Sequence, residues 1–72
     1  MRRYKVAVVG ATGVVGQELL KILSERNFPV GELTLLASAR SKGKQVDFRG
    51  DRLQVEEVSE SAVAGHDIVF FA

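Results

Sequence analysis

Three glycines spaced by three residues, Gly10, Gly13 and Gly16, follow directly after an apolar run at residues 6–9. The run supplies apolar side chains for both faces of a strand, as in a sheet that helices cover on both sides. Gly10 permits a tight turn, Gly13 lets backbone N–H groups approach a ligand, and Gly16 lets the next helix pack closely. The stretch therefore predicts a strand, a glycine loop and a helix that begins at a ligand.

The expected ligand is an anion. Unpaired N–H groups and the positive end of the helix dipole favour negative charge at a helix N-terminus, and after a buried strand this predicts the diphosphate of a dinucleotide. The spacing is G-x-x-G-x-x-G rather than the stricter G-x-G-x-x-G, so a purely structural turn between strand and helix remains the alternative.

The first half of the chain predicts a βαβ unit. Residues 4–9 form a strand, and the apolar periodicity after the loop predicts a helix that ends at Asn27, Phe28 and Pro29. A second strand follows at residues 33–37, parallel to the first and reached by a right-handed crossover. The residues that we expect on the buried face of the helix are Val14, Val15, Leu19, Ile22 and Leu23.

The second half predicts a small excursion and one more strand. Residues 46–49 and 53–56 alternate apolar with polar side chains, which is typical of two antiparallel strands. Residues 59–64 can form a short helix with Ser59 as its N-cap, and residues 68–71 form a third parallel strand. The fold class is therefore α/β: a partial Rossmann-like parallel sheet with a βαβ unit, a small antiparallel hairpin and a further parallel strand.

The segment after the second strand favours one cofactor. NAD sites carry an acidic residue about twenty positions after the glycines, whereas arginine accommodates the 2′-phosphate of NADP. Residues 38–44 contain no acid, and Arg40 lies between two hydroxyl residues, Ser38 and Ser41. A guanidinium flanked by hydroxyls suits a dianionic phosphate, so NADP is favoured over NAD. The alternative is a solvated basic turn, and we expect at least one of Lys42 and Lys44 to face water.

Composition limits the other possibilities. Seventy-two residues allow one small domain, and a net charge of +1 gives no general attraction to nucleic acid or membrane. The chain has no cysteine and one histidine, so we expect no disulfide, no cysteine nucleophile and no metal site. No apolar stretch reaches the length of a membrane helix and no signal-type region is visible, so a soluble, cytoplasmic protein is expected.

The last predicted strand has consequences for the whole chain. Residues 68–71 would expose apolar surface if no helix followed them to cover it. We therefore expect the chain to be a piece of a longer protein.

Three segments together resemble the N-terminal cofactor-binding part of bacterial aspartate-semialdehyde dehydrogenases. They are KVAVVGATGVVGQELL, NFPVGELTLLASARSKGK and GHDIVFFA, at residues 5–20, 27–44 and 65–72. The similarity extends over essentially all 72 residues, and LASARSKGK is more specific than the glycine loop. Residues 1–72 are then an incomplete N-terminal NADP-binding domain, and the catalytic and dimerisation domain lies outside this chain.

The resemblance implies an NADP-dependent enzyme of lysine, threonine and methionine biosynthesis. In that family aspartyl 4-phosphate is reduced to aspartate semialdehyde through a cysteine thioester, and the enzyme is a homodimer or tetramer. The residues that the resemblance places at the diphosphate are Gly10, Thr12, Gly13, Val14 and Val15. It places Ser38, Arg40 and Ser41 at the adenosine 2′-phosphate. Because the chain lacks cysteine, it is not expected to be active alone.

Two other functions remain open at this point. One is a non-catalytic relative that keeps the nucleotide-binding fold for regulation or assembly. The other is a reductase of the extended short-chain type, which also uses a GATG loop. The sequence beyond Ala72 would distinguish the three functions. A cysteine in an Asn-Cys setting would indicate the dehydrogenase, and the absence of that cysteine would indicate the non-catalytic relative. A Tyr-x-x-x-Lys pair would indicate the short-chain reductase.

Overall fold

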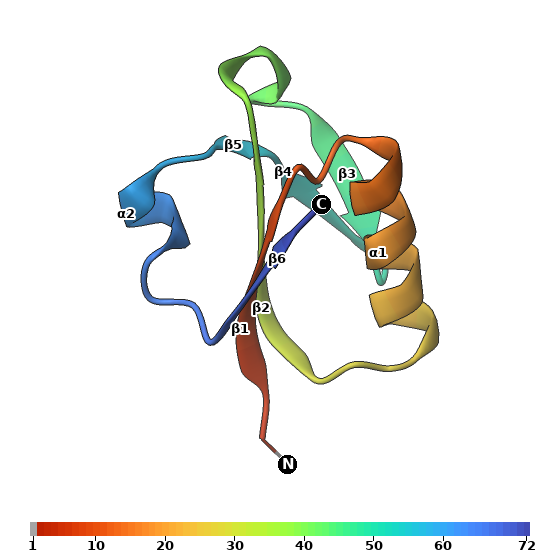
Figure 1. Cartoon of the computed structure of the whole chain (residues 1–72). Coiled ribbons are helices and arrows are strands. Elements are labelled where there is room, and N and C mark those ends of the chain that lie inside the picture. The colour runs from red at the N-terminus through yellow and green to blue at the C-terminus, as the bar shows by residue number, and fades with distance from the viewer. Residues whose placement is uncertain (1) are drawn as a thin grey trace.

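The computed structural model describes residues 2–72 as a four-stranded parallel sheet with helices on its two faces and a separate two-stranded hairpin (Figure 1). The elements in chain order are β1 (Tyr4–Val9), α1 (Val14–Glu25), β2 (Val30–Ala37), a one-turn 3₁₀ helix η1 (Ala39–Ser41), β3 (Gln45–Phe48), β4 (Asp51–Gln54), β5 (Glu56–Glu57), α2 (Glu60–Val63) and β6 (Ile68–Phe71). The expected α/β class, with a parallel sheet and an antiparallel pair, is confirmed.

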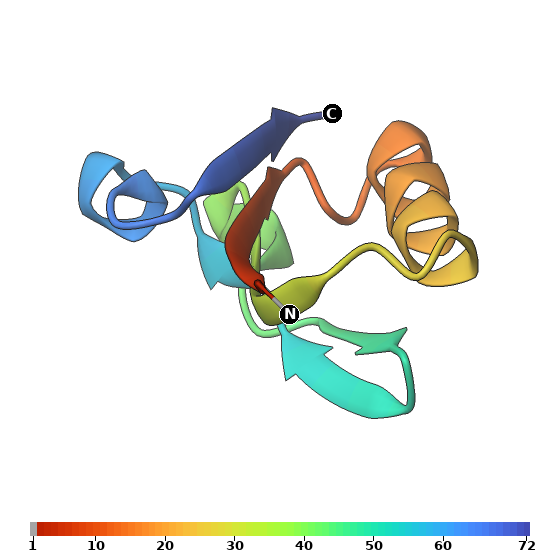
Figure 2. The same cartoon turned by 90° about the horizontal axis from the view of Figure 1, so that it is seen from below.

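The sheet has the strand order β5-β2-β1-β6, so β1 lies inside it and β6 at one edge. The first strand pairs in parallel with β2, where Val9 lies beside Leu36, and with β6, where Val9 lies beside Phe71. Val6 and Val8 on one face and Ala7 on the other are all fully buried, as expected for a strand covered on both faces. Figure 2 shows α1 and α2 on opposite sides of the sheet.

A pair of hydrogen bonds fixes the start of β6 against the start of β1. The backbone N–H of Lys5 donates to Oδ2 of Asp67 at 2.8 Å, and the N–H of Asp67 donates to the carbonyl oxygen of Lys5 at 2.8 Å. These bonds lie directly before the paired residues Val6 and Ile68. They therefore fix the register of the two strands at one end.

The buried face of α1 differs from the prediction. The structure buries Gly16, Leu20 and Leu23, whereas Val14 and Val15 are 86% and 66% exposed. Ile22 is also exposed, and of the expected set Leu23 is buried and Leu19 packs partly against the core. The predicted face was wrong because it followed the periodicity of the largest apolar side chains and did not combine it with the close packing expected at Gly16. Gly16 faces the glycine loop, where no side chain fits, and it fixes the rotation of the helix.

Three smaller differences concern the strands. β2 begins at Val30, three residues before the predicted start, because the chain enters the sheet directly after Pro29. The second strand of the hairpin is Asp51–Gln54 rather than residues 53–56. The pair Glu56–Glu57 instead forms β5, which lies parallel to β2. The turn between β3 and β4 uses Arg49 and Gly50, both at positive φ.

The short helix α2 has the predicted cap. Oγ of Ser59 accepts a hydrogen bond from the backbone N–H of Ala62 at 3.1 Å, and Gly65 follows the helix with a φ of +82°. Such a cap satisfies one of the N–H groups that a helix start leaves unpaired. α2 connects β5 to β6 on the face of the sheet opposite α1 (Figure 1).

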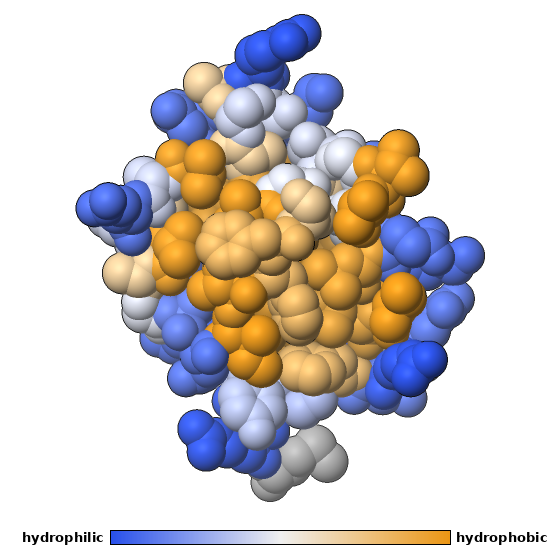
Figure 3. All heavy atoms as spheres, viewed as in Figure 1, coloured by the Kyte–Doolittle hydropathy of each residue, from blue (hydrophilic) through white to orange (hydrophobic). Residues whose placement is uncertain are grey.

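One face of the molecule is strongly apolar. Figure 3 shows apolar side chains gathered over β6 and the adjoining side of α1. Phe71, at the end of β6, is 76% exposed. Within residues 2–72, no helix combines the length and apolar character needed to cross a membrane.

Candidate functional site

The glycine loop leaves β1 through a turn that is tied to β2. Gly10 has a φ of +86°, which L side chains rarely adopt, and its backbone N–H donates to the carbonyl oxygen of Leu36 at 2.8 Å. The N–H of Ala11 donates to the same oxygen at 3.2 Å, and the Ala11 side chain is fully buried. The start of the loop is therefore held at the carboxyl end of the neighbouring strand.

The start of α1 packs directly against this turn. A Cβ atom on Gly16 would lie 2.2 Å from the carbonyl oxygen of Gly10 and 2.8 Å from Cα of Ala11, both backbone atoms. A Cβ atom on Gly13 would instead lie 3.5 Å from that oxygen, which is an ordinary contact. Gly16 is thus required for helix packing, as the sequence predicts.

Several backbone donors at the start of α1 remain available. The N–H of Gly13 donates to the carbonyl oxygen of Gly10 at 3.1 Å, and Gly13 caps the helix without a side-chain hydrogen bond. The N–H groups of Thr12, Val14 and Val15 make no hydrogen bond within residues 2–72. Three donors at the positive end of a helix dipole suit an anionic group.

The basic segment begins where β2 ends. Residues 39–41 form η1, and the N–H of Ser41 donates to the carbonyl oxygen of Ser38 at 2.9 Å. Arg40 is exposed and takes part in neither of the ion pairs found within residues 2–72. Lys42 and Lys44 are exposed as well.

The structure brings the glycine loop and the basic segment together. β1 and β2 are adjacent and parallel, so their carboxyl ends meet at one edge of the sheet, which is where ligands bind in open α/β folds. Across that edge, Oγ1 of Thr12 and Oγ of Ser41 lie 3.1 Å apart and share a hydrogen bond. All the residues assigned to the cofactor from sequence lie on these two segments.

Val58 is a residue of this edge that sequence reasoning missed. Its backbone N–H donates to the carbonyl oxygen of Ala37 at 2.8 Å, which places it beside the end of β2, and its side chain is 40% exposed. An exposed apolar side chain at the end of β2 offers a surface for a flat ring. The only signal was an isolated valine after two glutamates, and its position depends on β5, which the sequence did not predict.

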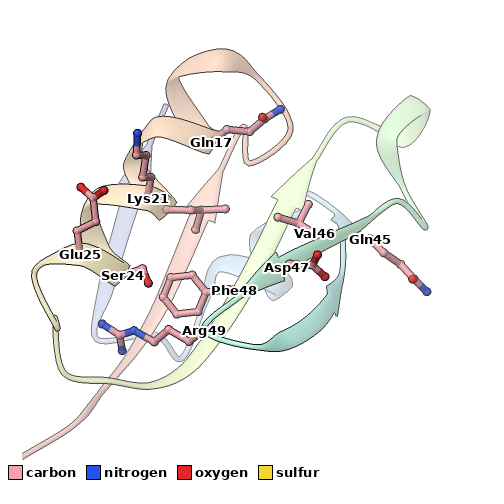
Figure 4. Close-up of a pocket in the computed structure, with 10 residues that line it drawn as sticks. Gln17, Lys21, Ser24, Glu25, Gln45, Val46, Asp47, Phe48 and Arg49 are labelled. Carbon is pink, nitrogen blue, oxygen red and sulfur yellow. The ribbon is translucent and has the colours of Figure 1, made fainter.

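A separate cavity of about 500 Å³ lies between α1 and β3 (Figure 4). Leu20 and Phe48 are its buried apolar residues, and Arg49 lies at one end. Nη2 of Arg49 donates to the carbonyl oxygen of Leu23 at 2.7 Å, and its guanidinium lies 5.0 Å from the centre of the Phe48 ring. The cavity is lined by Gln17, Leu20, Lys21, Ser24, Glu25, Gln45, Val46, Asp47, Phe48 and Arg49.

Arg49 joins the hairpin to the last turn of α1, so its removal should lower stability. We expect Arg49→Ala to reduce the free energy of unfolding by about 1.5 kcal/mol, because a charged donor to a helix carbonyl is lost. Chemical denaturation followed by circular dichroism measures this. Arg52→Ala is the matched control, since the ion pair between Arg52 and Asp47 is exposed and should contribute less than about 1 kcal/mol. Equal losses in both variants would contradict the assignment.

Comparison with known protein families gives a match over most of the chain. Residues 5–72 match the family described as semialdehyde dehydrogenase, NAD binding domain. The chain is 54% identical over 65 residues to aspartate-semialdehyde dehydrogenase of Synechocystis, an alignment that covers 90% of this chain and 19% of the relative. It is 51% identical over 71 residues to the Bacillus subtilis enzyme of the same name, covering 99% of this chain and 20% of the relative.

Two further similar proteins are a solved structure and a relative that carries a different name. The crystal structure of aspartate semialdehyde dehydrogenase II from Vibrio cholerae complexed with ASA superposes with a TM-score of 0.92 at 45% identity, covering 99% of this chain and 23% of that one. A protein named USG-1 protein homolog from Azotobacter vinelandii is 51% identical over 67 residues, covering 93% of this chain and 20% of the relative. The chain spans about a fifth of the length of the curated relatives it matches.

Proposed function

The chain belongs to the semialdehyde dehydrogenase family, whose NAD-binding domain it matches, and on that premise we propose that it is the N-terminal cofactor-binding part of an NADP-dependent aspartate-semialdehyde dehydrogenase. The resemblance to bacterial aspartate-semialdehyde dehydrogenases seen in the sequence is confirmed by relatives about 50% identical over most of the chain. The match favours this function over that of an extended short-chain reductase. The complete enzyme would convert aspartyl 4-phosphate to aspartate semialdehyde in the cytoplasm as a homodimer or tetramer.

The glycine loop is the proposed diphosphate site. The free N–H groups of Thr12, Val14 and Val15 would donate to the phosphate oxygens. Gly10 and Gly13 serve through their lack of a side chain, because their own N–H groups already bond within the protein. These residues fit a bound dinucleotide, because the unpaired N–H groups lie at the start of α1 and Gly13 leaves room for a phosphate to approach the backbone closely.

The basic segment is the proposed 2′-phosphate site. Arg40 carries a guanidinium that no carboxylate neutralises within residues 2–72, and Ser38 and Ser41 add hydroxyl groups on the same turn. The observation that carries the proposal is the 3.1 Å contact between Thr12 and Ser41, because it places the two segments at one edge. A dinucleotide bound at the loop would have its adenosine half directed to this segment, with Val58 beside the base.

The reaction itself needs groups outside residues 1–72. When bound, NADPH supplies a hydride, and this part of the chain binds and orients it. The chain contains no cysteine, so the nucleophile of the proposed thioester must come from another part of the complete enzyme.

The proposal is tested with the intact protein that contains this chain. Aspartate semialdehyde, inorganic phosphate and NADP are mixed with it, and formation of NADPH is followed by absorbance. We expect NADPH formation that depends on phosphate and semialdehyde together and that is much slower with NAD. NADP binding without any NADPH formation would contradict the proposed activity.

That second outcome would favour a non-catalytic nucleotide-binding relative. The observation behind this alternative is the identity of 51% to a relative with a different name, which equals the identity to the Bacillus subtilis dehydrogenase. Sequence identity in the cofactor-binding part therefore does not distinguish a dehydrogenase from a non-catalytic relative. A cysteine in an Asn-Cys setting beyond residue 72 separates them.

A further inference from the structure

The hydroxyl groups of Thr12 and Ser41 link two segments that are far apart in the sequence. Thr12 lies in the glycine loop and Ser41 is the last residue of η1, 29 positions later. Their oxygens are 3.1 Å apart, and both side chains are half-buried. Within residues 2–72, this is the only hydrogen bond between residues 10–16 and residues 38–44.

Each end of this link is held by its own element. The carbonyl oxygen of Thr12 accepts a hydrogen bond from Nε2 of Gln17 at 2.9 Å, which fixes Thr12 against α1. The backbone of Ser41 bonds on both sides, to Ser38 at 2.9 Å and from Lys44 at 3.1 Å. None of these backbone bonds joins the two segments, so the hydroxyl contact is the hydrogen bond that ties η1 to the glycine loop.

The position of η1 determines where Arg40 lies. Arg40 is the residue before Ser41 in a single helical turn, so a shift of Ser41 carries Arg40 with it. The pair also keeps a free donor, since two hydroxyl groups offer two O–H donors and their shared bond uses one. The remaining O–H, on Ser41 or on Thr12, lies beside the turn that carries Arg40 and is available to an anionic group there.

We propose that Thr12, although it lies on the diphosphate loop, is a positioning residue that acts through Ser41 to set the preference for a 2′-phosphorylated dinucleotide over its unphosphorylated form. The inference rests on the proposed cofactor site. It assigns Thr12 an effect on selectivity between the two dinucleotides, which a plain diphosphate contact would not have, since NAD and NADP share the diphosphate.

The test measures the dissociation constants of NADP and NAD for the intact protein by calorimetry. We expect Thr12→Val to weaken NADP binding about fivefold, the equivalent of one neutral hydrogen bond, and to change NAD binding by less than about twofold. Ser41→Ala should lower the preference for NADP by at least the same factor, because it removes a proposed phosphate donor together with the contact to Thr12. The double variant should be no worse than Ser41→Ala alone, because both changes break the one contact between the two hydroxyl groups.

Two further variants control the result. Thr12→Ser keeps the hydroxyl and should retain the wild-type preference for NADP. Thr34→Val removes a hydroxyl elsewhere, from a 2.8 Å contact with His66, and should leave both dissociation constants unchanged. Thermal unfolding checks that each variant is folded. If Thr12→Val does not fold, the comparison of Ser41→Ala with Thr12→Ser still tests the inference.

The outcomes separate this inference from the proposed function. Equal weakening of NADP and NAD by Thr12→Val, or losses that multiply in the double variant, would overturn the inference while the wild type still prefers NADP. A wild-type protein that binds the two dinucleotides equally would overturn the 2′-phosphate site and the inference with it.

Discussion

Replacing Gly16 with alanine should strongly destabilise the protein. The new Cβ atom would lie 2.2 Å from the carbonyl oxygen of Gly10 and 2.8 Å from Cα of Ala11. Neither atom can move aside, because the N–H groups of Gly10 and Ala11 are bonded to β2. We expect a loss of about 3 kcal/mol or more in the free energy of unfolding, at the upper end of overpacking costs and a large part of the stability of a small domain.

Gly13→Ala is the matched control for this variant. It adds the same atom three residues earlier, at a φ of −75°, where the nearest atom would be 3.5 Å away. Its cost should be about 0.5 kcal/mol, the preference for glycine over alanine at a helix N-cap. Urea denaturation of both variants in the intact protein measures the difference. Similar midpoints for the two would show that the loop moves more easily than its hydrogen bonds indicate.

Replacing Arg40 with alanine should remove the preference for NADP. A hydrogen bond to a charged group contributes about 1.5–3 kcal/mol, so the dissociation constant of NADP should rise roughly ten- to hundredfold. NAD lacks the 2′-phosphate, and its dissociation constant should change by less than about twofold. Arg40→Lys should restore part of the affinity, since lysine keeps the charge but not the planar pair of donors.

Lys42→Ala controls for the loss of one positive charge from the same segment. Lys42 is exposed and lies two residues further along the chain, after the end of η1. An effect on NADP as large as that of Arg40→Ala would indicate a diffuse electrostatic attraction instead of a specific site. The role assigned to Arg40 fails if NADP affinity does not fall relative to NAD.

The strands of the parallel sheet could be predicted because their signal is local. β1 agrees with the prediction from Tyr4 to Val9, and β6 from Ile68 to Phe71, since each is a short apolar run bounded by turn residues. β5 could not be predicted in this way. Glu56 and Glu57 are both exposed, and the strand exists only because its backbone pairs with Leu36 and Ala37.

The rotation of α1 shows a second limit. Periodicity indicates that a helix is amphipathic, but the two valines at its start and Ile22 were assigned to the buried side although they face outward. The contact that decides the rotation joins Gly16 to Gly10, across the loop. Gly16 is buried because it lacks a side chain, and a pattern based on apolar side chains does not detect such a residue.

The same reasoning applies to the candidate site. The residue types at the glycine loop and at residues 38–44 identify the two halves separately. Their meeting depends on the parallel pairing of β1 with β2 and on the contact between Thr12 and Ser41, which no local pattern contains. Ser41 was predicted as a phosphate ligand, and the structure adds that its hydroxyl is already bonded to the loop.

The bonds between Lys5 and Asp67 affect how the chain can fold during its synthesis. The two residues are 62 positions apart, yet they begin the pairing of the strand that lies inside the sheet. Because a ribosome releases the N-terminus first, β1 is made earliest and gains its second neighbour last. Until β6 emerges, one edge of β1 stays unpaired and can pair with other chains, so the domain is most exposed to aggregation before its last strand is made.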